Sequence, residues 1–262
     1  VTLTPTEYRE LSKRAQAAIA YGRAQSRSGP LGATAAWRTL REAGIDTQEA
    51  KEIAFTVAVT DFSNRAHTMV GAPYRPAERL PEQALTRLLR PVIDRMMSKR
   101  RWRGQPAPQP PADAALPYGG LVAAYAGSPI AGALQGLLSE MWASPILSRR
   151  CKLLMFAVVS RGLPCELCEL EITRALQREG LDPQALQRIL GRLDAPELDA
   201  VERLLLPLAR ETLWYEPAVL QRRLRGLRDA LTPPQLIEAI GVCALANALC
   251  RMTAVVLAAQ DA

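Results

Sequence analysis

Apolar residues recur along the chain at the three-to-four-residue spacing of amphipathic helices, and short breaks containing proline or glycine separate these stretches. Alternating β-branched runs bounded by hairpin turns are absent from the sequence. The pattern therefore predicts an all-α fold of the helical-bundle type. The expected helices cover residues 5–24, 33–43, 48–70, 81–101, 119–126, 129–142, 146–161, 164–179, 183–191, 197–214, 217–230 and 233–259.

A proline-rich stretch at residues 105–117 is the clearest boundary in the chain. We expect a helical half without a close cysteine pair at 1–75, a basic helix and linker at 76–118, and a second helical half at 119–262. The basic helix ends in a run of lysine and arginine around Trp102. This run is typical of a solvated helix end, and a docking patch for an acidic partner or a phosphate is the alternative.

The two expected halves share a short internal echo. Residues 40–43 resemble residues 227–230, and three further positions then match in order. The matched pairs are Glu52 with Glu238, Asp61 with Asn247, and Arg65 with Arg251. The echo predicts a duplicated helical unit, and we expect the two arginines to form buried polar ties between helices rather than to bind substrate.

The chain holds one C-x-x-C motif, formed by Cys165 and Cys168. Two cysteines at this spacing at the start of a helix are typical of a dithiol/disulfide pair. Pro164 favours a helix start there, so that Cys165 should lie in the first turn, where the helix dipole lowers a thiol pKa. Arg161 would act in the same direction, whereas nearby glutamates would raise the pKa, so the sign of the net shift stays open.

Glu169 follows Cys165 by one helical turn and is our candidate for a general base. The alternative is a solvated glutamate that interacts favourably with the helix dipole. For the cysteine pair itself, the alternative is two small buried residues that pack a helix start. We expect His67, the single histidine, to lie at the surface, and Cys243 and Cys250 to be core residues.

Composition narrows the remaining classes of function. The formal net charge is +7, but the excess is mostly arginine scattered along helices, which disfavours nucleic acid as a partner. Five cysteines do not suggest a secreted disulfide framework, and a reducing cytoplasm is expected. No apolar stretch approaches the roughly 20 residues of a membrane span. We expect no metal and no cofactor, since a zinc site, a phosphate loop and a dinucleotide fingerprint all lack their motifs.

Three parts of the sequence together resemble the AhpD-like / carboxymuconolactone decarboxylase family. They are the run from Ser148 to Ser160, the C-x-x-C helix ending at Gly180, and the run from Leu231 through Glu238 to Arg251. The resemblance implies an all-α fold, a homo-oligomer, and a dithiol that reduces peroxide with the help of a glutamate and a histidine. In this chain the histidine position is Ile172, and the glutamate position falls on Leu153 or Lys152.

On this basis we expect a thiol-dependent oxidoreductase that reduces peroxide or exchanges disulfides through Cys165 and Cys168, with Glu169 as the proton-transfer group. The electrons would come from a small thiol or a dithiol protein, and no membrane is expected as a partner. Which cysteine attacks is left open. The alternatives are a non-catalytic oligomeric scaffold or partner-binding relative, and a lactone decarboxylase-like enzyme.

Overall fold

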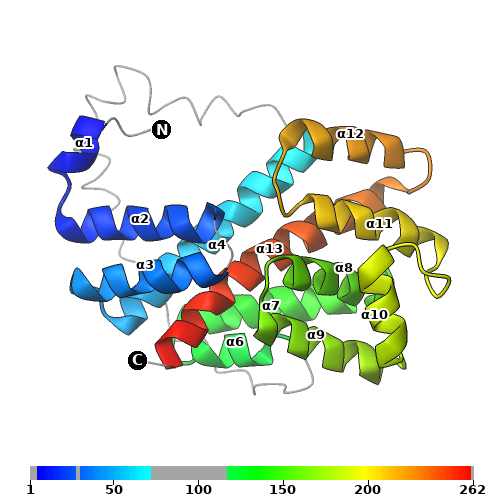
Figure 1. Cartoon of the computed structure of the whole chain (residues 1–262), viewed down its shortest axis with the longest axis horizontal. Coiled ribbons are helices and arrows are strands. Elements are labelled where there is room, and N and C mark those ends of the chain that lie inside the picture. Colours follow the sequence, from blue (N-terminus) through cyan, green and yellow to red (C-terminus); the bar gives the residue numbers. More distant parts are fainter. Residues whose placement is uncertain (1–4, 28–29, 72–116, 261–262) are drawn as a thin grey trace.

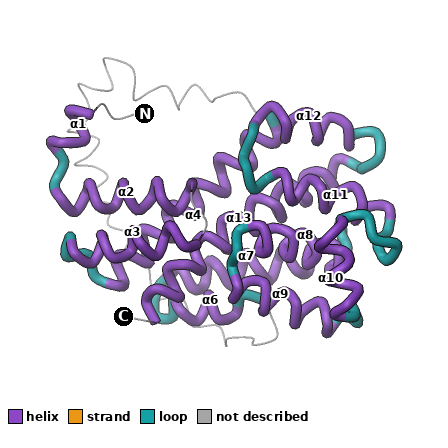
Figure 2. Tube along the Cα trace, in the orientation of Figure 1, coloured by secondary structure: helices purple, strands orange, loops and turns teal. Residues whose placement is uncertain are grey.

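The computed structural model describes residues 5–27, 30–71 and 117–260 of the 262-residue chain. In these ranges every regular element is an α-helix, and none is a strand (Figure 2). The predicted all-α fold is therefore confirmed. The helices are α1 (Pro5–Glu10), α2 (Lys13–Arg27), α3 (Pro30–Glu42), α4 (Thr47–Val70), α6 (Gly119–Ala124), α7 (Pro129–Ala143), α8 (Arg149–Gly162), α9 (Glu166–Arg178), α10 (Pro183–Arg192), α11 (Ala200–Glu211), α12 (Pro217–Leu227) and α13 (Pro233–Gln260).

Two expected elements, the basic helix at 81–101 and most of the linker at 105–117, lie outside the described residues. The single helix predicted over 5–24 is divided into α1 and α2. The division has a local cause, because the hydroxyl of Ser12 accepts a hydrogen bond from the backbone N–H of Ala15 at 3.2 Å. A serine that binds an N–H three residues later starts a new helix.

Helices α4 and α13 form the axis of the molecule and run side by side in opposite directions (Figure 1). Helices α2 and α3 pack on one side of this pair, and α8 packs against α13 on the other side. All residues of α8 from Cys151 to Ser160 are buried. A helix segment that is buried on every face must be apolar almost all round, and the run from Leu153 to Val159 contains only apolar residues.

One described helix is long and apolar enough to cross a membrane by length and composition alone. It is the Pro233–Thr253 part of α13, with a mean hydropathy of 1.5. The expectation that no stretch approaches this length was therefore too strict. In the fold, 78% of this segment is buried among other helices, so packing in the core accounts for its apolar residues.

A continuous hydrophobic core joins the segments before and after residues 72–116. It extends from Trp37 and Leu40 of α3 to Trp142 of α7 and Phe156 of α8. The three matched pairs of single residues lie on the two axial helices, but one of these pairs differs in its surroundings. Glu238 is close to the buried Lys152, whereas Glu52 lies on the surface and accepts from Gln48. The duplication stays a prediction.

Candidate functional site

The cysteine pair lies where α8 passes into α9. Cys165 is the residue that precedes α9, and its N–H donates to the carbonyl of Ser160 at 3.0 Å. Cys168 lies in the first turn of the helix. The two sulfurs form a disulfide, with the Cα atoms 5.3 Å apart, which is an ordinary separation for such a bond. The predicted proximity of the two cysteines is thus present, although Cys165 lies just before the helix rather than in its first turn.

Both cysteines are buried, with 1% of each residue exposed. A cavity of about 10 Å³ lies beside Cys168. It is lined by one residue of α6 and the residue just before that helix, by three residues of α9 and by one of α13; they are Leu121, Tyr118, Leu167, Cys168, Glu171 and Thr253. A space of this size holds about one water molecule. The pair is therefore closed to large molecules in this conformation, and Cys168 is the cysteine that borders free volume.

A third cysteine, Cys250 of α13, lies next to the pair. The three sulfurs of Cys165, Cys168 and Cys250 all lie within 4.8 Å of one another. Burial raises the pKa of the Cys250 thiol to about 12, so that this thiol is protonated at neutral pH. Cys250 lies in the core, as its sequence pattern predicts. No local pattern indicates that it neighbours the pair, because α9 and α13 are far apart along the chain.

Tyr118 and Glu171 complete the surroundings of the sulfurs. The Tyr118 hydroxyl lies 3.6 Å from the Cys250 sulfur. The backbone N–H of Tyr118 donates a hydrogen bond to the Glu171 carboxylate. Burial raises the pKa of Glu171, while the hydrogen bond from Tyr118 and the charge of Arg174 partly oppose that shift. Glu171 is therefore a carboxyl group of raised proton affinity that lines the same cavity as Cys168.

Glu169, the proton-transfer residue chosen from the sequence, has another partner. Its carboxylate accepts from the Arg161 side chain at 3.0 Å and 2.7 Å, and Arg161 also donates to Gln187. About one third of each side chain of this ion pair is exposed. Glu169 does not line the cavity beside Cys168. The positive charge of Arg161, which we expected to act on the thiols, is thus directed at Glu169.

The positions of the histidine and the glutamate in the AhpD-like pattern carry residues with other roles in this chain. Ile172 is fully buried in the core. The buried Lys152 donates to the carbonyls of Met141 and Ser144 at 2.6 Å and 2.7 Å, and it lies 3.3 Å from the Glu238 carboxylate. These contacts tie the connection between α7 and α8 to the start of α13, which is a structural role.

The single histidine lies on the exposed side of α4. Its Nδ1 atom is 2.8 Å from the carbonyl of Ser63 and 3.3 Å from the Ser63 hydroxyl, one turn earlier in the same helix. The expectation of a surface histidine is confirmed. Cys243 is a buried free thiol, which confirms the expected core position, and Cys151 is a further buried free thiol.

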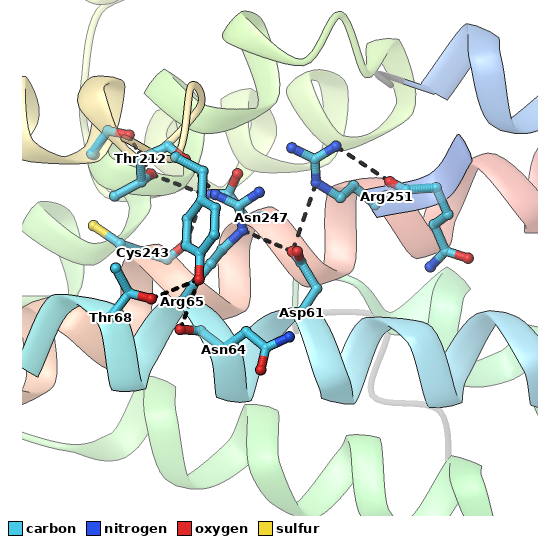
Figure 3. Close-up of polar contacts among 11 residues, drawn as sticks. Asp61, Asn64, Arg65, Thr68, Thr212, Cys243, Asn247 and Arg251 are labelled. Atoms are coloured by element: carbon cyan, nitrogen blue, oxygen red, sulfur yellow. Dashed lines mark hydrogen bonds and ion pairs between the residues drawn. The ribbon is translucent and has the colours of Figure 1, made fainter. Parts of the chain in front are cut away.

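The echoed arginines meet in a buried polar cluster between α4 and α13 (Figure 3). The Asp61 carboxylate is shared, since it lies 2.8 Å from Nε of Arg65 and 3.8 Å from Nε of Arg251. Arg65 also donates to the carbonyl of Thr212, and Asn247 donates to the Thr212 hydroxyl at 2.9 Å. The predicted ties between helices are confirmed.

Among the described residues, the three neighbouring cysteines are the group with the chemistry for a metal. Three thiolates at this separation suit a soft ion such as zinc or copper(I). Two of the three sulfurs are bonded to each other here, and a disulfide does not offer thiolate ligands. The cluster therefore fits a metal only in its reduced form.

No family model, no curated protein and no solved structure matches the chain. The resemblance to AhpD-like proteins therefore stays a prediction from the motifs, and the site is interpreted from its own geometry.

Proposed function

We propose that the protein is a thiol-dependent oxidoreductase of the AhpD-like type that reduces a small peroxide through Cys165 and Cys168. The observation that carries the proposal is that the two sulfurs are within bonding distance while the backbone keeps its hydrogen bonds at the start of α9. A pair that can be bonded in the folded protein is suited to repeated oxidation and reduction. The proposed setting is a reducing cytoplasm, and the proposed assembly is a homo-oligomer.

In the proposed cycle, the thiolate of Cys168 attacks one oxygen of the peroxide and the O–O bond breaks. The other oxygen takes up a proton and leaves as water or an alcohol, and Cys168 becomes a sulfenic acid. Cys165 then attacks this sulfur, the S–S bond forms, and the sulfenic oxygen leaves as water. A small thiol or a dithiol protein returns two electrons and two protons, and its own sulfurs become a disulfide.

The choice of Cys168 as the attacking residue rests on the cavity, because Cys168 lines it and Cys165 does not. Glu171 lines the same cavity, and its pKa is raised by burial. A carboxyl group with a raised pKa keeps its proton to a higher pH than an ordinary glutamate, and it can deliver that proton to the leaving oxygen. We therefore propose Glu171, rather than Glu169, as the proton-transfer group.

The size of the cavity favours a small oxidant. A volume of about 10 Å³ accommodates a molecule close to water in size, and hydrogen peroxide is the smallest peroxide. A protein disulfide, like the thiol that later re-reduces the pair, would reach either sulfur only when the helices around the pair separate, whereas a small peroxide could react in the closed conformation. This supports peroxide reduction over disulfide exchange.

The burial of the pair favours a second candidate function. Since 1% of each cysteine is exposed, the disulfide is also compatible with a non-catalytic helical scaffold or partner-binding protein. In that case the bond would hold the start of α9 and would not turn over.

Peroxide consumption with dithiothreitol as the reductant separates the two candidates. We expect turnover by the unaltered protein and its loss in both Cys165→Ser and Cys168→Ser. After one equivalent of peroxide, Cys165→Ser should carry a sulfenic acid on Cys168 that dimedone traps, because attack remains possible and resolution does not. Cys168→Ser should carry no trapped adduct at Cys165.

Cys243→Ser is the matched control, since Cys243 is a buried free thiol on α13 outside the three-sulfur group. It should turn over at the rate of the unaltered protein. Equal peroxide loss in all four proteins, together with a pair that no thiol reagent modifies in the folded state, would leave the scaffold function.

A further inference from the structure

A second cavity, which shares no lining residue with the small cavity beside Cys168, has a volume of about 630 Å³. This is within the range of small-molecule sites. Residues of α2 and α4 and of the connection between α11 and α12 line it, and Arg251 of α13 contributes a further side chain. None of the three neighbouring cysteines lines this cavity.

The charged side chains of this lining are mostly cationic. Arg23, Arg65 and Arg251 belong to it, and Asp61 is the one acidic residue among the described lining residues. Arg65 and Arg251 are 2% and 3% exposed, respectively. Buried arginines are costly unless negative charge and hydrogen-bond acceptors surround them, and here both guanidinium groups approach the same carboxylate.

The two guanidinium groups influence each other. Burial lowers the pKa of Arg251, and the charge of Arg65 lowers it further, while Asp61 acts in the opposite direction. An anion in the cavity would stabilise both charges at once. Guanidinium groups present five N–H donors in a planar fork, which suits the oxygens of a carboxylate or a phosphate.

Part of the remaining lining is suited to an apolar body. Val57 of α4 and Leu213 belong to it, together with two aromatic residues of the connection between α11 and α12. The Tyr215 ring lies under the Arg65 guanidinium at 4.7 Å. Trp214 is 64% exposed, so that its ring is available to a ligand at the mouth of the cavity. An exposed tryptophan beside a cationic site is typical of a surface that contacts an amphipathic molecule.

We propose that this cavity binds a small organic anion, with its carboxylate or phosphate group on Arg65 and Arg251 and its apolar body against Val57 and Trp214. The arginines keep their role as ties between helices, because the contacts to Asp61 and Thr212 use only part of the donor set of Arg65. The site is independent of the proposed peroxide chemistry.

Calorimetric titration of the intact protein with benzoate, benzamide, phenyl phosphate and inorganic phosphate tests the proposal. Benzamide has nearly the shape of benzoate and no charge. We expect benzoate or phenyl phosphate to bind at least about tenfold more tightly than benzamide, and inorganic phosphate to bind more weakly than phenyl phosphate. Equal affinities of benzoate and benzamide would contradict the proposal.

Three variants locate the site. Asp61→Asn removes the shared negative charge and should increase the affinity for the anion severalfold, whereas a role limited to structure predicts no increase. Arg251→Lys keeps the positive charge but removes the planar guanidinium group with its paired N–H donors, and it should weaken binding about tenfold. Trp214→Ala changes an exposed side chain, and should weaken the binding of phenyl phosphate without affecting inorganic phosphate.

Arg192→Gln is the matched control, because Arg192 is an exposed arginine at the end of α10 and does not line the cavity. It should leave every affinity unchanged. If Asp61→Asn does not fold, the exposed Trp214 position still decides the outcome, since an unchanged affinity for phenyl phosphate in Trp214→Ala overturns the proposed placement of the ligand.

Discussion

At the scale of single residues, two glutamates of α9 stand two positions apart in opposite surroundings. Glu169 is at the surface in an ion pair with Arg161, and Glu171 faces the interior beside Tyr118. Burial raises the pKa of the Glu171 carboxyl group. Only the inward position is suited to proton transfer near the sulfurs.

The raised pKa of Glu171 predicts a pH-dependent stability. Burial raises the pKa above its unfolded value of 4.5, so the stability that this residue contributes is fully present below that value. The contribution is lost as the pH rises through the higher folded pKa. We expect Glu171→Gln, which stays neutral, to gain stability relative to the unaltered protein as the pH rises from 4 to 7 in urea denaturation.

Glu169→Gln is the control for that measurement. It removes a surface ion pair, which is worth at most about 1 kcal/mol, and it should lower the free energy of unfolding slightly at pH 7. A Glu171→Gln variant whose relative stability does not change over this pH range would contradict the raised pKa of the Glu171 carboxyl group.

The Cys250 thiol predicts a specific disulfide pattern. Although its sulfur lies within 4.8 Å of both sulfurs of the pair, its pKa is about 12, and a protonated thiol does not attack a disulfide. Peptide mass spectrometry after oxidation at pH 7 should therefore show the Cys165–Cys168 link and a free Cys250. A substantial Cys168–Cys250 link would contradict this prediction.

The sequence predicted the cysteine pair but not its neighbours, and the reason is geometric. A C-x-x-C motif is local, whereas Tyr118 and Cys250 reach the pair from other helices. The choice of Glu169 assumed that Cys165 begins the helix and that one turn separates the two residues. Since Cys165 precedes α9, the helical face must be counted from Cys168, and the residue three positions later is Glu171.

At the scale of elements, capping residues explain how far the helix bounds could be predicted. Pro183 and Pro217 open α10 and α12 as expected, and Asp182 caps α10 by accepting from Ala185 at 2.9 Å. The helix expected from residue 197 begins instead at Ala200, the first residue of α11. Asp199 and Glu202 form a capping box, and this reciprocal pair fixes the first turn several residues later.

The capping box predicts a measurable stability effect. The Asp199 carboxylate accepts from the Glu202 N–H at 2.8 Å, and loss of such a cap costs about 1 kcal/mol. Asp199→Ala should lower the free energy of unfolding by that amount in urea denaturation. Asp194→Ala changes an exposed aspartate of the same connection that caps no helix, and it should have little effect. Equal losses in the two variants would show that general charge, rather than the cap, is responsible.

At the scale of the whole molecule, the axial contact between α4 and α13 makes the two expected halves depend on each other. Buried residues of α4 such as Ala54 and Ala58 belong to the same core as Ala244 and Ala248 of α13. The Asp61 carboxylate also lies between an arginine of its own helix and Arg251 of the other. Separation of the two halves would expose this core to water and would break the contact between Asp61 and Arg251.

This dependence predicts a single cooperative unfolding transition. A shared core means that neither half retains its burial when the other unfolds, so calorimetry should give one transition with equal calorimetric and van't Hoff enthalpies. Loss of helix followed by circular dichroism should coincide with the fluorescence change of the buried Trp37 and Trp142, which belong to α3 and α7, one in each expected half. Two resolved transitions would instead mean that each half has a sufficient core of its own, and the contact between α4 and α13 would then be an interface between domains rather than the centre of one.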